Sequence, residues 1–162
     1  MPAVKDPALD PERDLVLERV IDVPPEHVWA VWTRPELLKR WFCPAPWQVV
    51  DCEIDLRPGG IFRTVMRGPD GEESDSAGCW LEVVENERLV FTDALGPGFR
   101  PALEAFFSAE IRLTPEKTGT RYVAIARHAT PEACKQHAEM GFHEGWGRAL
   151  DQLVELAKGL RE

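Results

Sequence analysis

GFHEGWGRALDQL (residues 141–153) has the apolar spacing of an amphipathic helix, yet it contains three glycines, Gly141, Gly145 and Gly147. A glycine in a helix interior costs about 0.5–1 kcal/mol relative to alanine. We therefore expect this helix to lie across a curved sheet, where missing side chains permit close approach or leave space. Gly147 falls nearer the outer side of the helix, and this explanation does not cover it.

The predicted helix begins well before this stretch. Thr130-Pro131 supplies a good N-cap followed by a good first helical residue. We predict one continuous helix from there to about Leu160, about 40 Å long at 1.5 Å per residue. At about 100° per residue, its packed face carries Ala138, Phe142, Gly145, Ala149, Leu153, Leu156 and Leu160.

The remaining chain is dominated by strand patterns. Residues 14–23 alternate as a first strand, and Pro24-Pro25 and then Thr33-Arg34-Pro35-Glu36 open two short helices. Between Trp47 and about His128, short turns separate further strand-like runs, at 47–56, 61–67, 78–85, 88–93, 103–113 and 120–128. Short turns between neighbouring strands favour an antiparallel sheet. The order predicts an α+β domain in which the long helix covers one sheet face.

Composition bounds the class of protein. A chain of 162 residues fits one domain, expected over 14–162, after a polar, proline-rich N-terminal arm over 1–13 that resembles no targeting peptide. The net charge of −9 and scattered basic residues argue against nucleic-acid binding, and no apolar run approaches a membrane span. Four cysteines without a C-x-x-C pair favour reduced thiols, a cytoplasmic location and no metal site.

Five segments together carry a family resemblance: VPPEHVWAVWTRPELLKRWFCP (23–44), CEIDLRPGGIFRTVMRGPDG (52–71), GCWLEVVENERLVFTDAL (78–95), GTRYVAIARH (119–128) and HAEMGFHEGWGRALDQL (137–153). They resemble the SRPBCC or START-like superfamily, in the bacterial branch named after the activator of the heat-shock-chaperone ATPase. The resemblance implies a helix-grip fold, in which a curved antiparallel sheet of about seven strands wraps around a long C-terminal helix, with a cavity between sheet and helix. It carries no shared catalytic motif, so no catalytic residue is assigned.

Aromatic side chains are the main candidates for lining such a cavity, with a few polar groups that orient the ligand. The candidate ligand-binding residues are Trp32, Trp41, Met66, Trp80, Phe91, Phe107, Tyr122, His128, Gly141, Phe142, Gly145 and Trp146. If Tyr122 is buried, its hydroxyl needs a hydrogen-bond partner and could orient a ligand. His128, at a strand end, is the histidine best placed to act as an acid or base at the cavity mouth.

Other charged residues have simpler interpretations. His137, Glu139, His143 and Glu144 are expected on a solvated helix face. The alternative is that Glu139 and His143, four residues apart, bind one metal ion. Asp51, Glu53 and Asp55 share one face of a predicted strand, and Arg63 and Arg67 lie on the next. Cross-strand ion pairs between these two sets are expected, each worth about 0.2–1 kcal/mol. The alternative is that Arg63 points inward and anchors a ligand carboxylate.

Three functions stay open at this point. The leading hypothesis is binding of an apolar or amphipathic small molecule, without a cofactor. The alternatives are a cyclase- or hydrolase-type enzyme and a co-chaperone domain that contacts a chaperone. The sequence also leaves a homodimer open, through the apolar loop residues Pro44, Pro46, Trp47, Leu95 and Phe99.

Overall fold

One antiparallel sheet organises the molecule. The structure, a computed structural model, describes residues 9–160. Its main strands are β1 (Asp14–Ile21), β2 (Gln48–Ile54), β3 (Ile61–Arg67), β4 (Glu73–Val84), β5 (Arg88–Thr92), β8 (Ser108–Glu116) and β9 (Gly119–Arg127). They form a 7-stranded sheet in the order β1-β9-β8-β5-β4-β3-β2, with every neighbouring pair antiparallel. This confirms the predicted sheet.

The connection between β5 and β8 contains a small hairpin of its own. The strands β6 (Leu95–Gly96) and β7 (Arg100–Pro101) pair on either side of the 3₁₀ turn η1 (Pro97–Phe99). Strand β8 therefore begins at Ser108, later than the predicted start at residue 103. Strand β4 begins at Glu73, earlier than predicted, and pairs with β3 along the whole length of β3.

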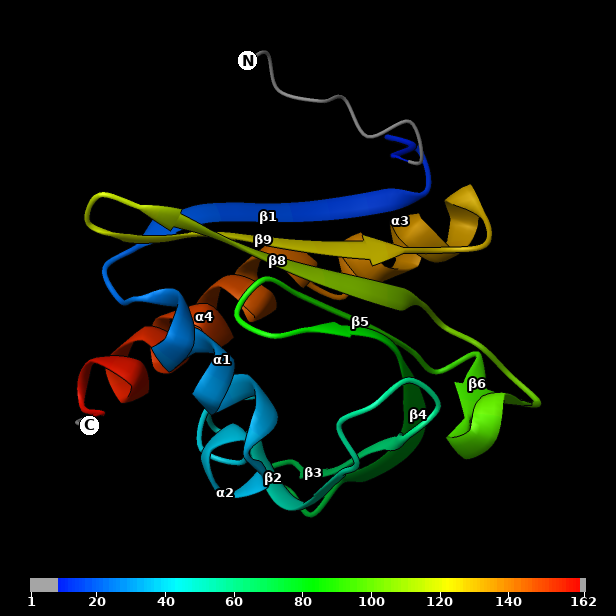
Figure 1. Ribbon diagram of the computed structural model, residues 1–162. Coiled ribbons are helices and arrows are strands. Elements are labelled where there is room, and N and C mark those ends of the chain that lie inside the picture. The colour runs from blue at the N-terminus through cyan, green and yellow to red at the C-terminus, as the bar shows by residue number, and fades with distance from the viewer. Residues whose placement is uncertain (1–8, 161–162) are drawn as a thin grey trace.

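Helices occupy one face of the curved sheet. They are α1 (Pro25–Thr33), α2 (Pro35–Leu38), α3 (Pro131–Glu139) and α4 (Phe142–Lys158). Figure 1 shows α4, α1 and α2 between the β1–β9–β8 side of the sheet and the β2–β3–β4 side. The helix-grip architecture and the two short helices after β1 are confirmed. Of the predicted N-terminal arm, residues 1–8 lie outside the described residues, and Asp10 to Arg13 form a turn.

The single C-terminal helix predicted over 131–160 is wrong. The chain leaves helical geometry at Gly141, whose φ of +94° lies in the left-handed region that favours glycine. The Gly141 amide donates to the Ala138 carbonyl at the end of α3, and the Gly141 carbonyl accepts from the Gly145 amide at the start of α4. Gly141 is thus the junction between two helices and not a packing glycine inside one.

Gly145 and Gly147, the other two glycines of this stretch, also differ from the prediction. A Cβ at Gly145 would make ordinary contact with Pro44, at 3.9 Å, so no close approach to the sheet requires glycine there. Gly147 is buried, and its Cβ would lie 3.2 Å from a guanidinium nitrogen of Arg19 on β1. The outward placement of Gly147 was therefore wrong, as was the packed placement of Ala138, which is exposed.

The core lies between the sheet and α1, α2 and α4. Two tryptophans, Trp32 on α1 and Trp41 in the turn after α2, are buried in it with their indole N–H groups satisfied. Trp32 Nε1 donates to the Tyr122 hydroxyl over 3.1 Å, and Trp41 Nε1 donates to the Val31 carbonyl over 2.8 Å. From α4, the side chains of Leu150 and Leu153 complete the core. The Trp32 bond joins α1 to β9 of the sheet, and the Trp41 bond joins the segment after α2 to α1.

Candidate functional site

A small pocket lies on the helix-bearing face of the sheet. Its volume is about 110 Å³. The lining side chains and backbone come from the β3, β4 and β5 strands, from the segment after α2 and from the segment before β8: Phe42, Phe62, Thr64, Met66, Ser76, Gly78, Phe91, Thr92, Asp93 and Phe107. Phe62 packs edge-on against Phe42 and Phe91, with ring centroids 5.7 and 4.8 Å away. The pocket therefore has an aromatic wall and a polar floor.

Strand register creates the polar floor. Thr64 on β3 lies opposite Ser76 on β4, and Thr64 follows Phe62 by two residues, so both point to the same face. Thr64 is only 5% exposed and lines the pocket, and no hydrogen bond from its hydroxyl is present among residues 9–160. Because a hydroxyl can donate or accept, it is suited to meet a polar group of a bound molecule.

Asp93 supplies the pocket's carboxylate. Its Oδ1 accepts hydrogen bonds from the backbone amides of Phe106, at 2.9 Å, and Phe107, at 3.2 Å. The neighbouring Thr92 hydroxyl accepts from the Ala94 amide and from the Ser108 hydroxyl. These bonds hold the segment before β8, and with it the Phe107 ring, at the pocket wall.

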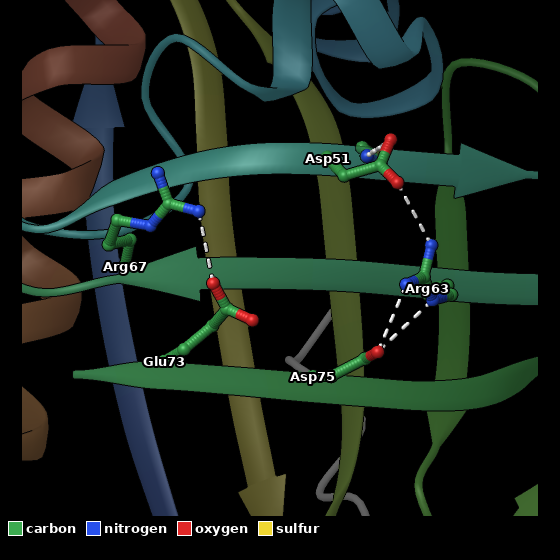
Figure 2. A network of polar contacts seen from close by, with 6 residues as sticks. Asp51, Arg63, Arg67, Glu73 and Asp75 are labelled. Atoms are coloured by element: carbon green, nitrogen blue, oxygen red, sulfur yellow. Dashed lines mark hydrogen bonds and ion pairs between the residues drawn. The ribbon is translucent and has the colours of Figure 1, made fainter. Parts of the chain in front are cut away.

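The arginines of β3 lie on the opposite face of the sheet. Figure 2 shows Arg63 bonded to Asp51 on β2 and to Asp75 on β4, and Arg67 bonded to Glu73. The guanidinium of Arg63 lies 3.0 Å from each of its two partners. It does not line the pocket, because Phe62 and Thr64, the residues on either side of Arg63, point to the pocket face of the sheet. Paired carboxylates raise the pKa of Arg63. The inward Arg63 alternative is therefore wrong, and the expected cross-strand pairing is confirmed for Asp51 and Arg63. Asp55 pairs instead with Arg57, and Arg67 pairs with Glu73 on β4.

The structure brings only part of the predicted ligand-binding set together. Met66, Phe91 and Phe107 line the pocket. Trp32, Trp41 and Tyr122 belong to the packed core, where burial raises the pKa of the Tyr122 hydroxyl and the Trp32 bond opposes that rise. Trp80 is fully buried and stacks on Phe62 behind the pocket wall, with a centroid distance of 4.4 Å.

The helix residues predicted to wall the cavity do not line this pocket. Gly141 forms the helix junction, and Gly145 lies beside Pro44. Phe142 and Trp146 pack on each other, with ring centroids 4.6 Å apart, and Trp146 reaches only the back of Phe107, at 5.8 Å. The cavity wall on this side is the Phe107 ring and not α4 itself.

A buried histidine pair stands behind Phe107. His128 Nδ1 lies 2.7 Å from the Arg13 carbonyl, which can only accept, so His128 donates there. His128 Nε2 lies 2.8 Å from His137 Nδ1. Both histidines are 7% exposed, so the solvated placement of His137 was wrong. Burial, and secondarily the charge of His128, lower the pKa of His137 to about 4.

Neither histidine lines the pocket, although the pair is close to it. The rings of Phe106 and Phe107 lie 4.7 and 5.2 Å from the His137 ring and stand between the pair and the pocket. Within the described part of the chain, Asp93 is the only titratable side chain that lines the pocket. The predicted acid or base role of His128 has no access to a ligand in this arrangement.

Sequence reasoning missed most of the polar lining. Thr64 and Phe62 had a usable signal, because IFRTVMR alternates and places them on the face of Met66, which was predicted. Phe42, Ser76 and Asp93 had none, since they reach the pocket through the curvature of the sheet and the path of connecting segments.

Metal and thiol chemistry find no support in the described residues. Across residues 9–160, no group of three or more histidine, cysteine, aspartate or glutamate side chains could hold a metal ion. All four cysteines are free, and burial raises the pKa of Cys43 and of Cys52 to about 11, which keeps both as unreactive thiols. No helix in that same range is long and apolar enough to cross a membrane.

A larger hollow elsewhere on the protein is the weaker candidate. A groove of about 590 Å³ runs along the outer side of α4 and is lined by charged side chains, among them Arg40, Arg148 and Asp151. It lies open on the surface, whereas ligand sites are usually concave and mostly apolar. The smaller pocket between sheet and helical layer fits that description better.

This curved sheet, the helices that it grips and the pocket on the helix-bearing face of the sheet define a helix-grip domain of the START-like, or SRPBCC, superfamily, which is a ligand-binding fold. Residues 22–158 match the family described as activator of Hsp90 ATPase homolog 1-like protein. The chain belongs to this family, and the resemblance stated from the sequence is confirmed.

Solved structures agree with this assignment. Protein NE0264 from Nitrosomonas europaea is similar, with 51% identity and a TM-score of 0.91 over 93% of this chain and 97% of that chain. Protein Ms6760 from Mycobacterium smegmatis has 28% identity and a TM-score of 0.74, over 93% and 94%. An AHSA1-like protein from Aeromonas hydrophila, at 22% identity and a TM-score of 0.69 over 90% and 92%, shares the fold. No curated protein sequence matches the chain.

Proposed function

We propose that the protein binds a small apolar or amphipathic molecule in the pocket between the sheet and its helical layer. One observation carries the proposal: an aromatic pocket of about 110 Å³ whose floor holds the Thr64 hydroxyl, which makes no hydrogen bond within residues 9–160. An apolar wall with a few polar groups is the usual composition of a small-molecule site. In this proposal, residues 14–162 act as one ligand-binding domain in the cytoplasm, where four free thiols persist.

The test uses toluene as a probe and amide NMR spectra of the whole chain as the readout. We expect toluene to shift the amides of β3, β4 and β5 next to the pocket. Ser76→Phe should fill the pocket mouth and abolish these shifts, because Ser76 lines the pocket and is exposed. Ala77→Phe is the matched control, since the next residue of the same strand points to the opposite face. Toluene shifts that survive Ser76→Phe, or that appear elsewhere, would reject this site.

No specific observation favours the other two hypotheses, an enzyme and a co-chaperone domain. An acid–base enzyme would need a titratable group at the ligand, and Asp93 is the lining candidate, already bonded to two backbone amides. A chaperone partner is suggested by the family's description alone. Homodimer formation through the apolar loop residues also stays a hypothesis, which sedimentation of the purified protein would test.

A further inference from the structure

We infer that the pocket selects ligands whose polar group donates a hydrogen bond, such as a hydroxyl or an amine, and rejects carboxylates. The inference rests on the proposed function and names the ligand class of the same site. It follows from the signs of the charges around the pocket, from the unsatisfied acceptors on its lining and from its size.

The first argument is the fixed carboxylate of Asp93. Its Oδ1 accepts from two successive backbone amides, of Phe106 and Phe107, which holds the side chain in place. Within residues 9–160, its second oxygen has no hydrogen-bond or ion-pair partner. An ionised carboxylate accepts hydrogen bonds and does not donate them. A donor group of a ligand can therefore bond to the second carboxylate oxygen of Asp93. A carboxylate of a ligand would instead be repelled by the negative charge of Asp93.

The second argument is the absence of a compensating cation. Among the described residues, no lysine, arginine or histidine side chain lines the pocket. The nearest arginines along β3, Arg63 and Arg67, lie on the other face and are paired with carboxylates there (Figure 2). Burying an anion beside a carboxylate, without a partner of opposite charge, is strongly unfavourable.

The third argument is the hydroxyl pair on the floor. Thr64 and Ser76 are directly opposite in the β3–β4 register, and neither hydroxyl has a hydrogen-bond partner in the described chain. A hydroxyl can donate or accept, so this pair satisfies a ligand hydroxyl in either role, while the rejection of carboxylates rests on Asp93 alone. The indole N–H of Trp80 also lacks a partner among residues 9–160, but its ring does not line the pocket.

Size limits the apolar part of the ligand. The pocket measures about 110 Å³ and opens beside the exposed Ser76. An enclosed cavity of about 150 Å³ holds benzene. A single ring, with part of it at the open side, is therefore the largest apolar group that the pocket takes without rearrangement.

The experiment compares four probes of nearly equal shape: toluene, benzyl alcohol, benzylamine and benzoate. Dissociation constants are measured by amide NMR titration of the full chain. We expect benzyl alcohol and benzylamine to bind at least about tenfold more tightly than benzoate, the scale of one charge-assisted hydrogen bond. Toluene should lie between the two groups.

Two variants assign the selectivity to named groups. Asp93→Asn keeps the Oδ1 acceptor for the two amides but removes the charge, and it should reduce the benzylamine-to-benzoate ratio at least about fivefold. Thr64→Val should lower the benzyl alcohol affinity relative to toluene by about threefold. Asp55→Asn, which removes an exposed carboxylate outside this pocket, is the charge control and should change nothing.

The outcomes separate the two proposals. If toluene binds but benzoate binds as well as benzylamine, the inference on ligand class is overturned and the binding site stands. If the selectivity survives Asp93→Asn unchanged, the assignment to Asp93 is overturned in the same way. If none of the four probes binds, the proposed function and this inference both fall.

Discussion

Acidification should destabilise the protein through the buried His128–His137 pair. The folded protein holds the pKa of His137 at about 4, against 6.5 for an ordinary histidine. Between these values the unfolded chain takes up a proton that the folded protein does not, so the free energy of unfolding falls as pH falls. The full effect is about 3 kcal/mol, and about 2 kcal/mol of it is lost between pH 7 and pH 5.

Hydrogen-bond geometry explains why the folded protein resists the proton. The Arg13 carbonyl fixes the proton of His128 on Nδ1, which leaves His128 Nε2 to accept from His137 Nδ1. A further proton must go to His137 Nε2, and the resulting charge would be enclosed by the rings of Phe106, Phe107 and Phe142. Burial without a counter-charge disfavours that ion.

Urea unfolding followed by tryptophan fluorescence at pH 7, 6 and 5 measures this effect. His137→Gln keeps a hydrogen-bonding amide but cannot titrate, and it should remove most of the pH-dependent loss. His143→Gln, which alters an exposed histidine on α4, should keep the loss of the unchanged protein. A flat stability between pH 7 and pH 5, or an equal slope in the His137→Gln variant, would refute the reasoning and show that the surrounding rings stabilise the cation as well as water does.

Three further predictions concern stability and are read from the same urea unfolding curves. Thr64→Val should raise the free energy of unfolding by about 1 kcal/mol, because the lost hydroxyl has no partner in the described chain. Thr120→Val should lower the free energy of unfolding by about 1–3 kcal/mol, because the Thr120 hydroxyl donates to a buried carbonyl. If both changes had the same sign, the assignment of Thr64 to the pocket floor would be contradicted. Gly141→Ala should cost about 1–3 kcal/mol at a positive φ, while Gly145→Ala should gain about 0.5–1 kcal/mol inside α4; the reverse order would mean that the helix is continuous. Tyr122→Phe should cost about 1–3 kcal/mol because it leaves a buried indole N–H without its acceptor, and a neutral result would mean that this bond contributes nothing net.

Local patterns were sufficient for the sheet. Alternation in Ile61–Arg67 and the turn signals that flank it depend on nearest neighbours, so the strand and the orientation of Met66 follow from sequence. The family resemblance added the curvature and the position of the helical layer.

The C-terminal region shows where periodicity misleads. The apolar period continues through residues 138–153 as if one helix ran across Gly141, but the buried residues of α3, Cys134 and His137, follow a different phase from those of α4. A helix that ends at glycine and one that passes through it have the same composition. Only the left-handed backbone at Gly141 distinguishes them.

The pocket's chemistry was the least predictable part. Asp93 and Phe107 meet because a connecting segment folds back onto β5, and the histidine pair forms because α3 returns beside the end of β9. No spacing rule encodes such meetings. They depend on the path of the chain after each strand ends.

The two terminal strands of the sheet have a consequence for how the protein behaves at high concentration. Strand β2 carries a register shift between Val49 and Asp51, and β1 is met at Val16 by the His143 side chain, whose Nε2 donates to the Val16 carbonyl over 3.1 Å. Edge strands that are irregular, charged or covered do not offer a straight row of free backbone N–H and C=O groups with which another molecule could pair. Fibrous or stacked self-association through either edge of the sheet is thereby disfavoured, even where the protein is concentrated.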